Sequence, residues 1–324
     1  MHHRRPVMRQ NRRPIRRRRR GCAPRAWLFI VLLFALGIGI YTLASGIDRD
    51  EAALINDKYL YEPRETYNEI DEYKKIEDEP EFPLQVVAIS THDIVNTGYL
   101  SLVNHQHPAP GDPDPNLLTP AWPTVAVSRV EGMYLHNSAL RAIAEMIESA
   151  RSLEVTGFFV TSAFRDFDAQ AYLFSDGENS GYIMPPGHSE HQTGLAADIL
   201  VIGQGMMDLP YTPEGQWLAG NSYRYGLILR YPQGAEHITG INFEPWHFRY
   251  VGQAHAYYMM KRGFVLEEYI IHLQDQGHIS FEKGGETIYV IFQRSQSGMI
   301  YVPYGRNFTV SSDNMGGYII WTTG

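Results

Sequence analysis

Cysteine is almost absent from the 324-residue chain, which has a single one, Cys22. One thiol excludes an intrachain disulfide, so the fold must be held by its core or by a metal. No internal repeat is visible. The hydrophobic content of 44% and the charged content of 20% are ordinary for a globular protein. The length allows one large domain, or two modest ones with tails.

Acidic residues are missing from residues 1–25, which contain eleven arginines. Removing that segment leaves 28 − 11 = 17 basic residues against 36 acidic ones, so the remainder carries a formal charge near −19. A charge asymmetry of this kind indicates membrane topology or a tail. We therefore interpret residues 1–25 as a basic cytoplasmic tail and expect no nucleic-acid partner.

Charge is absent again from the nineteen residues at positions 26–44, "AWLFIVLLFALGIGIYTLA". At about 1.5 Å per residue this run matches the thickness of a bilayer core. Because the arginines precede it, the positive-inside rule predicts a single-pass anchor at 26–45 with everything after it outside the cell membrane. A cleaved signal peptide is the alternative, since small residues follow at "ASG".

The rest of the chain divides by composition. Residues 46–83 are rich in acids and predict a stalk or linker. Residues 84–264 mix helical and strand patterns, including a helix over 138–151 that Asn137 or Ser138 can cap and a buried strand in "GLAADILVI". Residues 265–324 begin with a short helix and then alternate as strands, with "EKGGE" as a hairpin turn. This order predicts an α+β fold with a small β-rich C-terminal extension.

The stretch "GHSEHQTGLAADI", residues 187–199, holds three candidate metal ligands. His191 and Asp198 are seven apart, and a turn between them followed by a strand would let both side chains converge. Zinc accepts imidazole and carboxylate together. His188, three residues before His191, is a further candidate. The pair alone is a weak signal, since a capped turn with a surface histidine gives the same letters.

A second segment, "FEPWHFRY" at 243–250, offers His247 as a third ligand and Glu244 three residues earlier. Three protein ligands with one open position are typical of catalytic zinc rather than structural zinc. A carboxylate beside the metal can take a proton from water and pass it to a leaving amine. In "TSAFRDFDAQAY", Arg165 follows a predicted strand and could hold a carboxylate or a developing oxyanion, although a surface ion pair is an alternative.

Four segments, "SEHQTGLAAD", "EPWHFRYVG", "GLILRYPQGAEHITG" and "TSAFRDFDAQAYLF", resemble the VanY-like metallo D-alanyl-D-alanine carboxypeptidases, which share a fold with hedgehog signalling domains. The resemblance covers roughly residues 84–264. Thr161, Ala163 and Phe164 depart from the family's commonest letters, which puts the fine substrate preference in doubt. The resemblance implies an antiparallel sheet with flanking helices.

The resemblance also implies roles for particular side chains. The zinc ligands fall on His191, Asp198 and His247, which leaves His188 off the metal. The catalytic base falls on Glu244 and the transition-state arginine on Arg165. Residues that hold the terminal carboxylate end of the substrate fall on Ser189 and Gln170.

Together these features predict a zinc-dependent, membrane-anchored carboxypeptidase that removes the terminal D-alanine from peptidoglycan stem peptides. An L,D-carboxypeptidase acting on tetrapeptides remains open, and so does a zinc-containing module that binds wall peptide without cleaving it. A dipeptidase fits the exported topology less well. The sequence does not separate a role in glycopeptide resistance from ordinary wall maturation, and it assigns no chemistry to residues 265–324.

Overall fold

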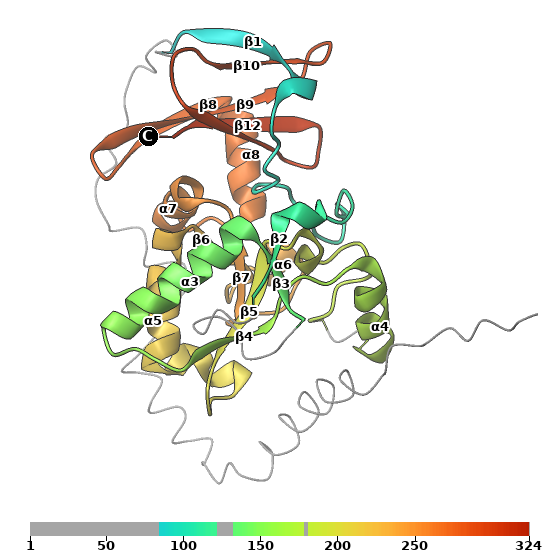
Figure 1. Ribbon diagram of the computed structural model, residues 1–324, viewed down its shortest axis with the longest axis vertical. Helices are drawn as coiled ribbons and strands as arrows, with labels where there is room; N and C mark the ends of the chain where they lie inside the picture. Colours follow the sequence, from blue (N-terminus) through green and yellow to red (C-terminus); the bar gives the residue numbers. More distant parts are fainter. Residues whose placement is uncertain (1–83, 122–131, 178–180, 324) are drawn as a thin grey trace, which may run out of the picture. The chain divides into compact units, whose positions relative to one another are not determined.

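The computed structural model describes residues 84–121, 132–177 and 181–323 (Figure 1). The predicted tail, anchor and stalk at 1–83 lie outside these residues and stay predictions. Within the described part, no helix is both long enough and apolar enough to cross a membrane.

The sheet that carries the predicted site residues has four antiparallel strands in the order β4-β5-β7-β6. Their bounds are β4 Phe158–Ser162, β5 Ala196–Val201, β6 Leu227–Leu229 and β7 His247–Tyr250. Because side chains alternate along a strand, Ala197, Ile199 and Val201 of β5 face one side, and Asp198 between them faces the other. The predicted antiparallel sheet is confirmed.

Helix α3, Asn137–Ser152, packs against the apolar face of this sheet (Figure 1). Its buried side chains, among them Ile143, Met146 and Ile147, join the β5 residues in one core. The cap of α3 differs from expectation, because the His136 side chain accepts the backbone N–H of Ser138 at 3.2 Å. The helix begins one residue early, so neither Asn137 nor Ser138 is left in the capping position. With α3 on one face, Asp198 points to the opposite face.

The C-terminal strands form a second four-stranded antiparallel sheet in the order β11-β12-β9-β8. Their bounds are β8 His278–Lys283, β9 Glu286–Arg294, β11 Phe308–Ser312 and β12 Gly317–Thr322. Helices α7, Gln253–Arg262, and α8, Leu266–Gln276, pack against one face through the cluster that contains Tyr269, Leu273, Val290 and Trp321. The predicted hairpin turns at Gly284 and Gly285, both at positive φ.

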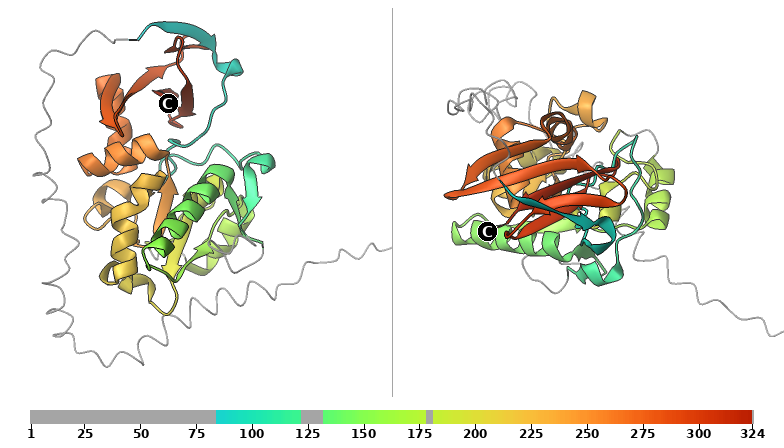
Figure 2. Two further views of the ribbon diagram at one scale, coloured as in Figure 1. Left: turned by 60° about the vertical axis from the view of Figure 1, so that its left-hand side comes forward. Right: turned by 90° about the horizontal axis from the view of Figure 1, so that it is seen from above.

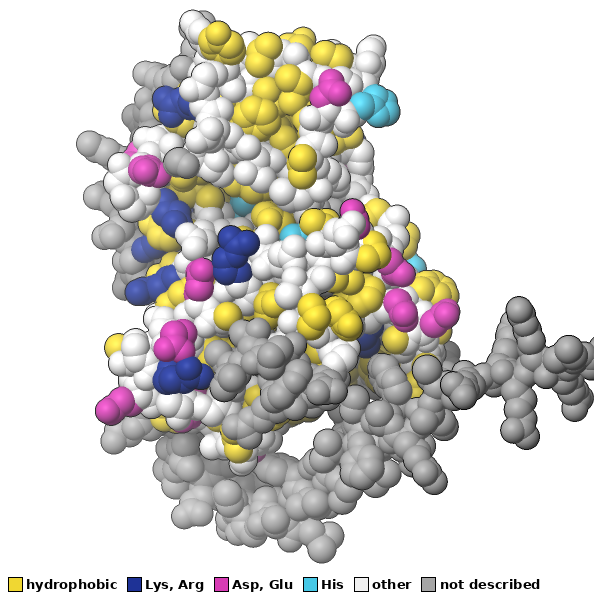
Figure 3. Space-filling view, viewed as in Figure 1, with side chains coloured by type: hydrophobic (Ala, Val, Ile, Leu, Met, Phe, Trp, Pro, Cys, Tyr) yellow, Lys and Arg dark blue, Asp and Glu magenta, His cyan; other side chains and the backbone are white. Residues whose placement is uncertain are grey.

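The other face of this second sheet is covered by a pair of antiparallel strands, β1 Val86–Ser90 and β10 Met299–Pro303 (Figures 1 and 2). Ile300 and Val302 turn inward, while Val86, Met299 and Tyr301 are exposed. Figure 3 shows hydrophobic side chains gathered over these outer strands. The start of the predicted 84–264 domain thus packs with the extension, although the division at 264/265 itself stays a prediction.

The remaining helices and strands connect these layers. They are β2 Leu118–Pro120, β3 Tyr134–His136, α4 Phe167–Gly177, α5 Pro213–Asn221 and α6 Glu236–Thr239. A short 3-10 helix, η4 Glu190–Thr193, leads directly into β5. It brings the first half of the predicted metal motif to the polar face of the first sheet.

Candidate active site

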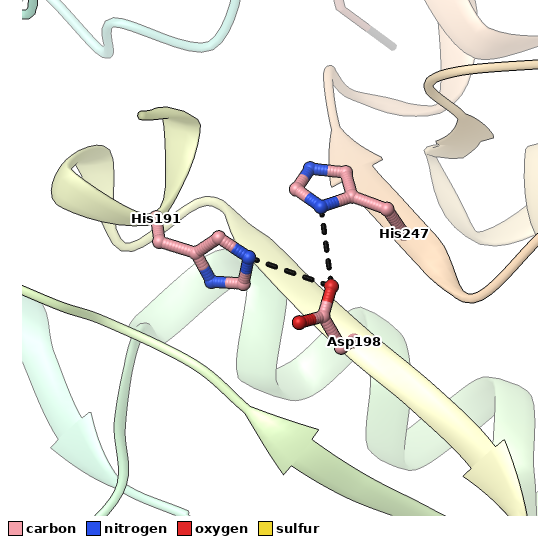
Figure 4. Close-up of side chains that lie close together, drawn as sticks. All are labelled: His191, Asp198 and His247. Carbon is pink, nitrogen blue, oxygen red and sulfur yellow. Dashed lines mark ion pairs between the residues drawn. The ribbon is translucent and has the colours of Figure 1, made fainter. Parts of the chain in front are cut away.

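The three predicted ligands meet on the polar face of the β4-β5-β7-β6 sheet (Figure 4). Asp198 of β5 and His247 of β7 are directly opposed across the two strands, and His191 approaches from η4. The Asp198 Oδ1 atom lies 3.4 Å from His191 Nε2 and 3.1 Å from His247 Nδ1. One potential ligand atom from each residue lies within 4.8 Å of the others.

The turn between His191 and Asp198 depends on Gly194, which ends η4 in the left-handed region at φ 70°. A β-carbon there would lie 2.8 Å from Leu118 Cδ2 and 3.2 Å from the backbone nitrogen of His136. Glycine therefore fits both the backbone conformation and the close approach. This turn brings His191 and Asp198, which are seven residues apart, to the same point.

Each histidine is held so that one ring nitrogen faces the cluster. His191 Nδ1 lies 2.7 Å from the carbonyl oxygen of Ala163, which leaves Nε2 directed at Asp198. Burial, aided by Arg165, lowers the pKa of His191 to about 4, so its ring is neutral at pH 7. A neutral imidazole with one nitrogen fixed by a carbonyl is the form that ligates metals.

His247 is surrounded by carboxylates. Its Nδ1 faces Asp198 and also lies 3.6 Å from Glu244 Oε2, while its Nε2 lies 3.6 Å from Glu190 Oε2. Burial favours the neutral ring, but Asp198 and Glu190 outweigh it and raise the pKa of His247 to about 9. Carboxylates that favour a proton on His247 also favour a metal cation in the place of that proton.

The residues fit a zinc ion. Asp198 Oδ1 is buried and has no hydrogen-bond partner, although two imidazole rings are directed at it. Two nitrogens and one carboxylate oxygen are a ligand set that zinc accepts, and three protein ligands leave one position open. The arrangement could therefore hold a catalytic rather than a structural ion.

Glu244 lies beside the cluster and outside the ligand set. Its backbone N–H donates to Tyr231 O at 3.0 Å and its carbonyl accepts from His247 N at 3.2 Å, so a tight turn fixes the two side chains together. Burial, reinforced by the negative charges of Asp198 and Glu190, raises the pKa of Glu244 to about 8. A carboxyl group beside a candidate metal site can both take and return a proton.

Arg165 is held by three side chains at the edge of the same site. Its Nε donates to Gln170 Oε1 at 2.9 Å, its Nη1 to Ser162 Oγ, and its Nη2 to Ser189 Oγ at 3.4 Å. The other end of the Gln170 amide donates to Met184 O at 2.6 Å. Both ends of Gln170 are therefore engaged in fixing Arg165, and its predicted contact with substrate stays a prediction.

His188 lies away from the cluster, because its Nδ1 is 2.8 Å from the carbonyl oxygen of Asn104. Sequence reasoning missed Glu190 and two fully buried arginines, Arg230 and Arg249. Glu190 Oε1 accepts from Arg230 Nε at 2.8 Å and from Arg249 Nη1 at 2.9 Å. The available signal was that Glu190 is an acid adjacent to the candidate ligand His191. The two arginines that bind Glu190 lie 40 and 59 residues away, too far for a local sequence pattern to show.

The chain was compared with known proteins. Residues 132–253 match the family model VanY, D-alanyl-D-alanine carboxypeptidase. A D-alanyl-D-alanine carboxypeptidase of Enterococcus faecium is 35% identical over 189 residues, covering 58% of this chain and 61% of that protein. The bifunctional D-Ala-D-Ala dipeptidase and carboxypeptidase VanXYC of Enterococcus gallinarum is 42% identical over 93 residues, covering 27% of this chain and 49% of that protein.

The chain thus spans less than two thirds of the length of either relative. Among solved structures, the vancomycin-resistance D,D-dipeptidase VanXYg, in complex with a D-Ala-D-Ala phosphinate analogue, superposes with a TM-score of 0.63 at 26% identity. The alignment covers 74% of this chain and 98% of that one. The matched residues 132–253 contain both halves of the His191, Asp198 and His247 cluster. Residues 132–253 are therefore a domain of the VanY D-alanyl-D-alanine carboxypeptidase family.

Proposed function

We propose that this protein is a zinc-dependent carboxypeptidase that removes the terminal D-alanine from peptidoglycan stem peptides. The observation that carries the proposal is the convergence of His191, Asp198 and His247, with Glu244 beside them and Arg165 at the edge. Family membership supports the same chemistry. The predicted anchor and stalk would place the domain in the wall zone, and they remain predictions.

In this proposal His191, Asp198 and His247 hold the ion, which when bound supplies Lewis acidity for polarising a carbonyl and activating water. Glu244 takes the proton from the attacking water and gives it to the departing amine. The tight turn that joins Glu244 to His247 keeps its carboxyl group beside the site for both steps.

Arg165 supplies a fixed positive charge at the edge of the site. Since Gln170, Ser162 and Ser189 all hold its guanidinium, the charge is preorganised and needs no rearrangement during the reaction. It can steady a developing oxyanion or pair with the terminal carboxylate of the peptide. Ser189 is close enough to Arg165 to share that carboxylate.

The test is amino-acid release by the purified, zinc-loaded chain from three substrates: a stem pentapeptide ending in D-Ala-D-Ala, the matching tetrapeptide, and free D-Ala-D-Ala. We expect the pentapeptide to be cleaved best. Preference for the tetrapeptide would favour L,D-carboxypeptidase activity. The free dipeptide is included because the neighbouring structure is that of a D,D-dipeptidase.

The matched variant for this test is Glu244→Gln, which keeps the shape of the side chain and removes the base. We expect kcat to fall by about 10²- to 10⁴-fold, the usual contribution of a positioned general base. Zinc content should stay at the wild-type level, because Glu244 lies outside the ligand set. Undiminished release by this variant would refute the assigned mechanism.

A further inference from the structure

Two buried polar atoms beside the candidate metal site face each other without a bond. Glu190 Oε2 and His247 Nε2 lie 3.6 Å apart, and neither has a hydrogen-bond partner. Leaving a buried polar atom unpaired lowers the stability of the folded protein. Because an N–H···O bond is about 2.9 Å long, a small closing movement would pair both atoms at once.

The Glu190 carboxylate is held where it cannot turn away. Its Oε1 accepts from Arg230 and Arg249, whose side chains are both fully buried. Arg230 is fixed in turn by two bonds to Glu267 of α8, at 2.9 and 2.7 Å. Arg249 Nη2 donates to the carbonyl oxygens of residues 99 and 101, each at 3.1 Å. Glu190 Oε2 is thus the only oxygen of this carboxylate left for His247.

The His247 ring lies between two groups of carboxylates. Nε2 faces Glu190, and on the opposite side Nδ1 faces Asp198 at 3.1 Å. A neutral imidazole has one donor and one acceptor nitrogen. A proton on Nε2 therefore leaves Nδ1 with the lone pair that a metal needs. His191 shows the reversed arrangement, with Nδ1 against the Ala163 carbonyl and Nε2 toward the cluster.

We propose that Glu190 is a positioning residue that accepts a hydrogen bond from Nε2–H of His247, fixing the tautomer and ring orientation that present Nδ1 to the metal. The inference rests on the metal site of the proposed function. Glu190 is connected through Arg230 to Glu267, so α8, which lies outside the matched domain, also supports the site.

Two variants of the full chain separate positioning from general support. Glu190→Gln keeps the shape, but its amide oxygen stays with the arginines and its NH₂ then meets His247 Nε2. That nitrogen must accept, so the proton moves to Nδ1. We expect zinc affinity, measured by competition with a chelator, to fall by about 10- to 100-fold, as for other residues that orient a ligating histidine.

The matched control is Glu267→Gln, which also takes a carboxylate from Arg230 but does not touch His247. We expect its zinc affinity to stay within about threefold of wild type, while its melting temperature falls. Equal weakening of zinc binding in both variants would overturn the proposal, because a merely structural role predicts it.

A measurement on the wild-type protein covers the case in which Glu190→Gln fails to fold. Histidine ¹⁵N NMR of the zinc-loaded chain should show His247 bound through Nδ1, with a slowly exchanging proton on Nε2. Coordination through Nε2 would overturn the proposal. Normal zinc binding without peptide cleavage would sink the proposed function and leave the role of Glu190 standing. Peptide cleavage with an unaffected Glu190→Gln variant would do the reverse.

Discussion

The two four-stranded antiparallel sheets differ in the side chains that line their faces. The β4-β5-β7-β6 sheet is apolar under α3 and polar on its other face, where Asp198 Oδ1 and His247 Nε2 are buried without hydrogen-bond partners. The β11-β12-β9-β8 sheet is covered by apolar side chains on both faces. Within the described residues, no strand of the second sheet carries an unpaired buried side-chain atom, although His255 Nε2 of α7, whose ring packs against Trp321 of β12, is one beside it.

Unpaired buried polar atoms cost stability, so a fold keeps them where something else compensates. The first sheet therefore carries the chemistry at a cost in stability, and the second contributes burial. If that division is right, substitutions on the polar face of the first sheet should lower activity without unfolding the protein. Substitutions in the core of the second sheet should lower stability without changing the activity of the folded protein.

The largest effect should come from removing the metal. With a strong chelator we expect peptide cleavage to fall by more than about 100-fold, since the Lewis acid is lost. The far-UV circular dichroism should persist, because both sheets are held by apolar clusters. Readdition of zinc should restore cleavage. Unfolding on chelation would mean that the ion is structural and that the contrast between the sheets fails.

The second largest effect should come from Ile319→Ala in β12, whose side chain is fully buried against α8. We expect the free energy of unfolding to fall by about 2–5 kcal/mol, from lost burial and the cavity left behind. Denaturant titration measures this. The kcat of the folded variant should not change. Ile271→Ala on the exposed side of α8 is the control and should cost less than about 1 kcal/mol.

The smallest effect should be a pH dependence of the free energy of unfolding that arises from His255, where α7 meets the second sheet. Its Nδ1 lies 2.8 Å from Tyr269 Oη, its ring packs edge-on against Trp321, and burial lowers its pKa to about 3. Between that pKa and the usual histidine pKa of about 6.5, the unfolded chain binds a proton that the folded chain does not. Stability should therefore fall as pH falls through this window, by up to about 1.4 kcal/mol per pH unit.

Denaturant titrations from pH 7 to pH 4 test this contribution. His255→Gln should flatten the slope relative to wild type. The site histidines are present in both proteins, so the difference isolates His255. Identical slopes for wild type and His255→Gln would show that its burial does not survive in solution.

The contrast between local and distant signals explains what could be predicted. The strand "GLAADILVI" and the hairpin at "EKGGE" were predictable, because periodicity and turn residues act over a few positions. The antiparallel sheet was predicted from the family resemblance alone. The cap at His136 was predicted wrongly, since the preference for Asn and Ser ignores an imidazole that happens to reach the Ser138 amide.

Two short segments of the sequence were enough to identify His191, Asp198 and His247 as candidate ligands and Glu244 as a candidate base. How these side chains are oriented follows from the fold. The pairing of β5 with β7 sets Asp198 opposite His247. The bonds that fix the His191 ring and Arg165 come from Ala163 and Gln170, and Arg230 holds Glu190 beside His247. A hydrogen bond depends on where the folded backbone places two atoms, and spacing along the chain does not contain that information.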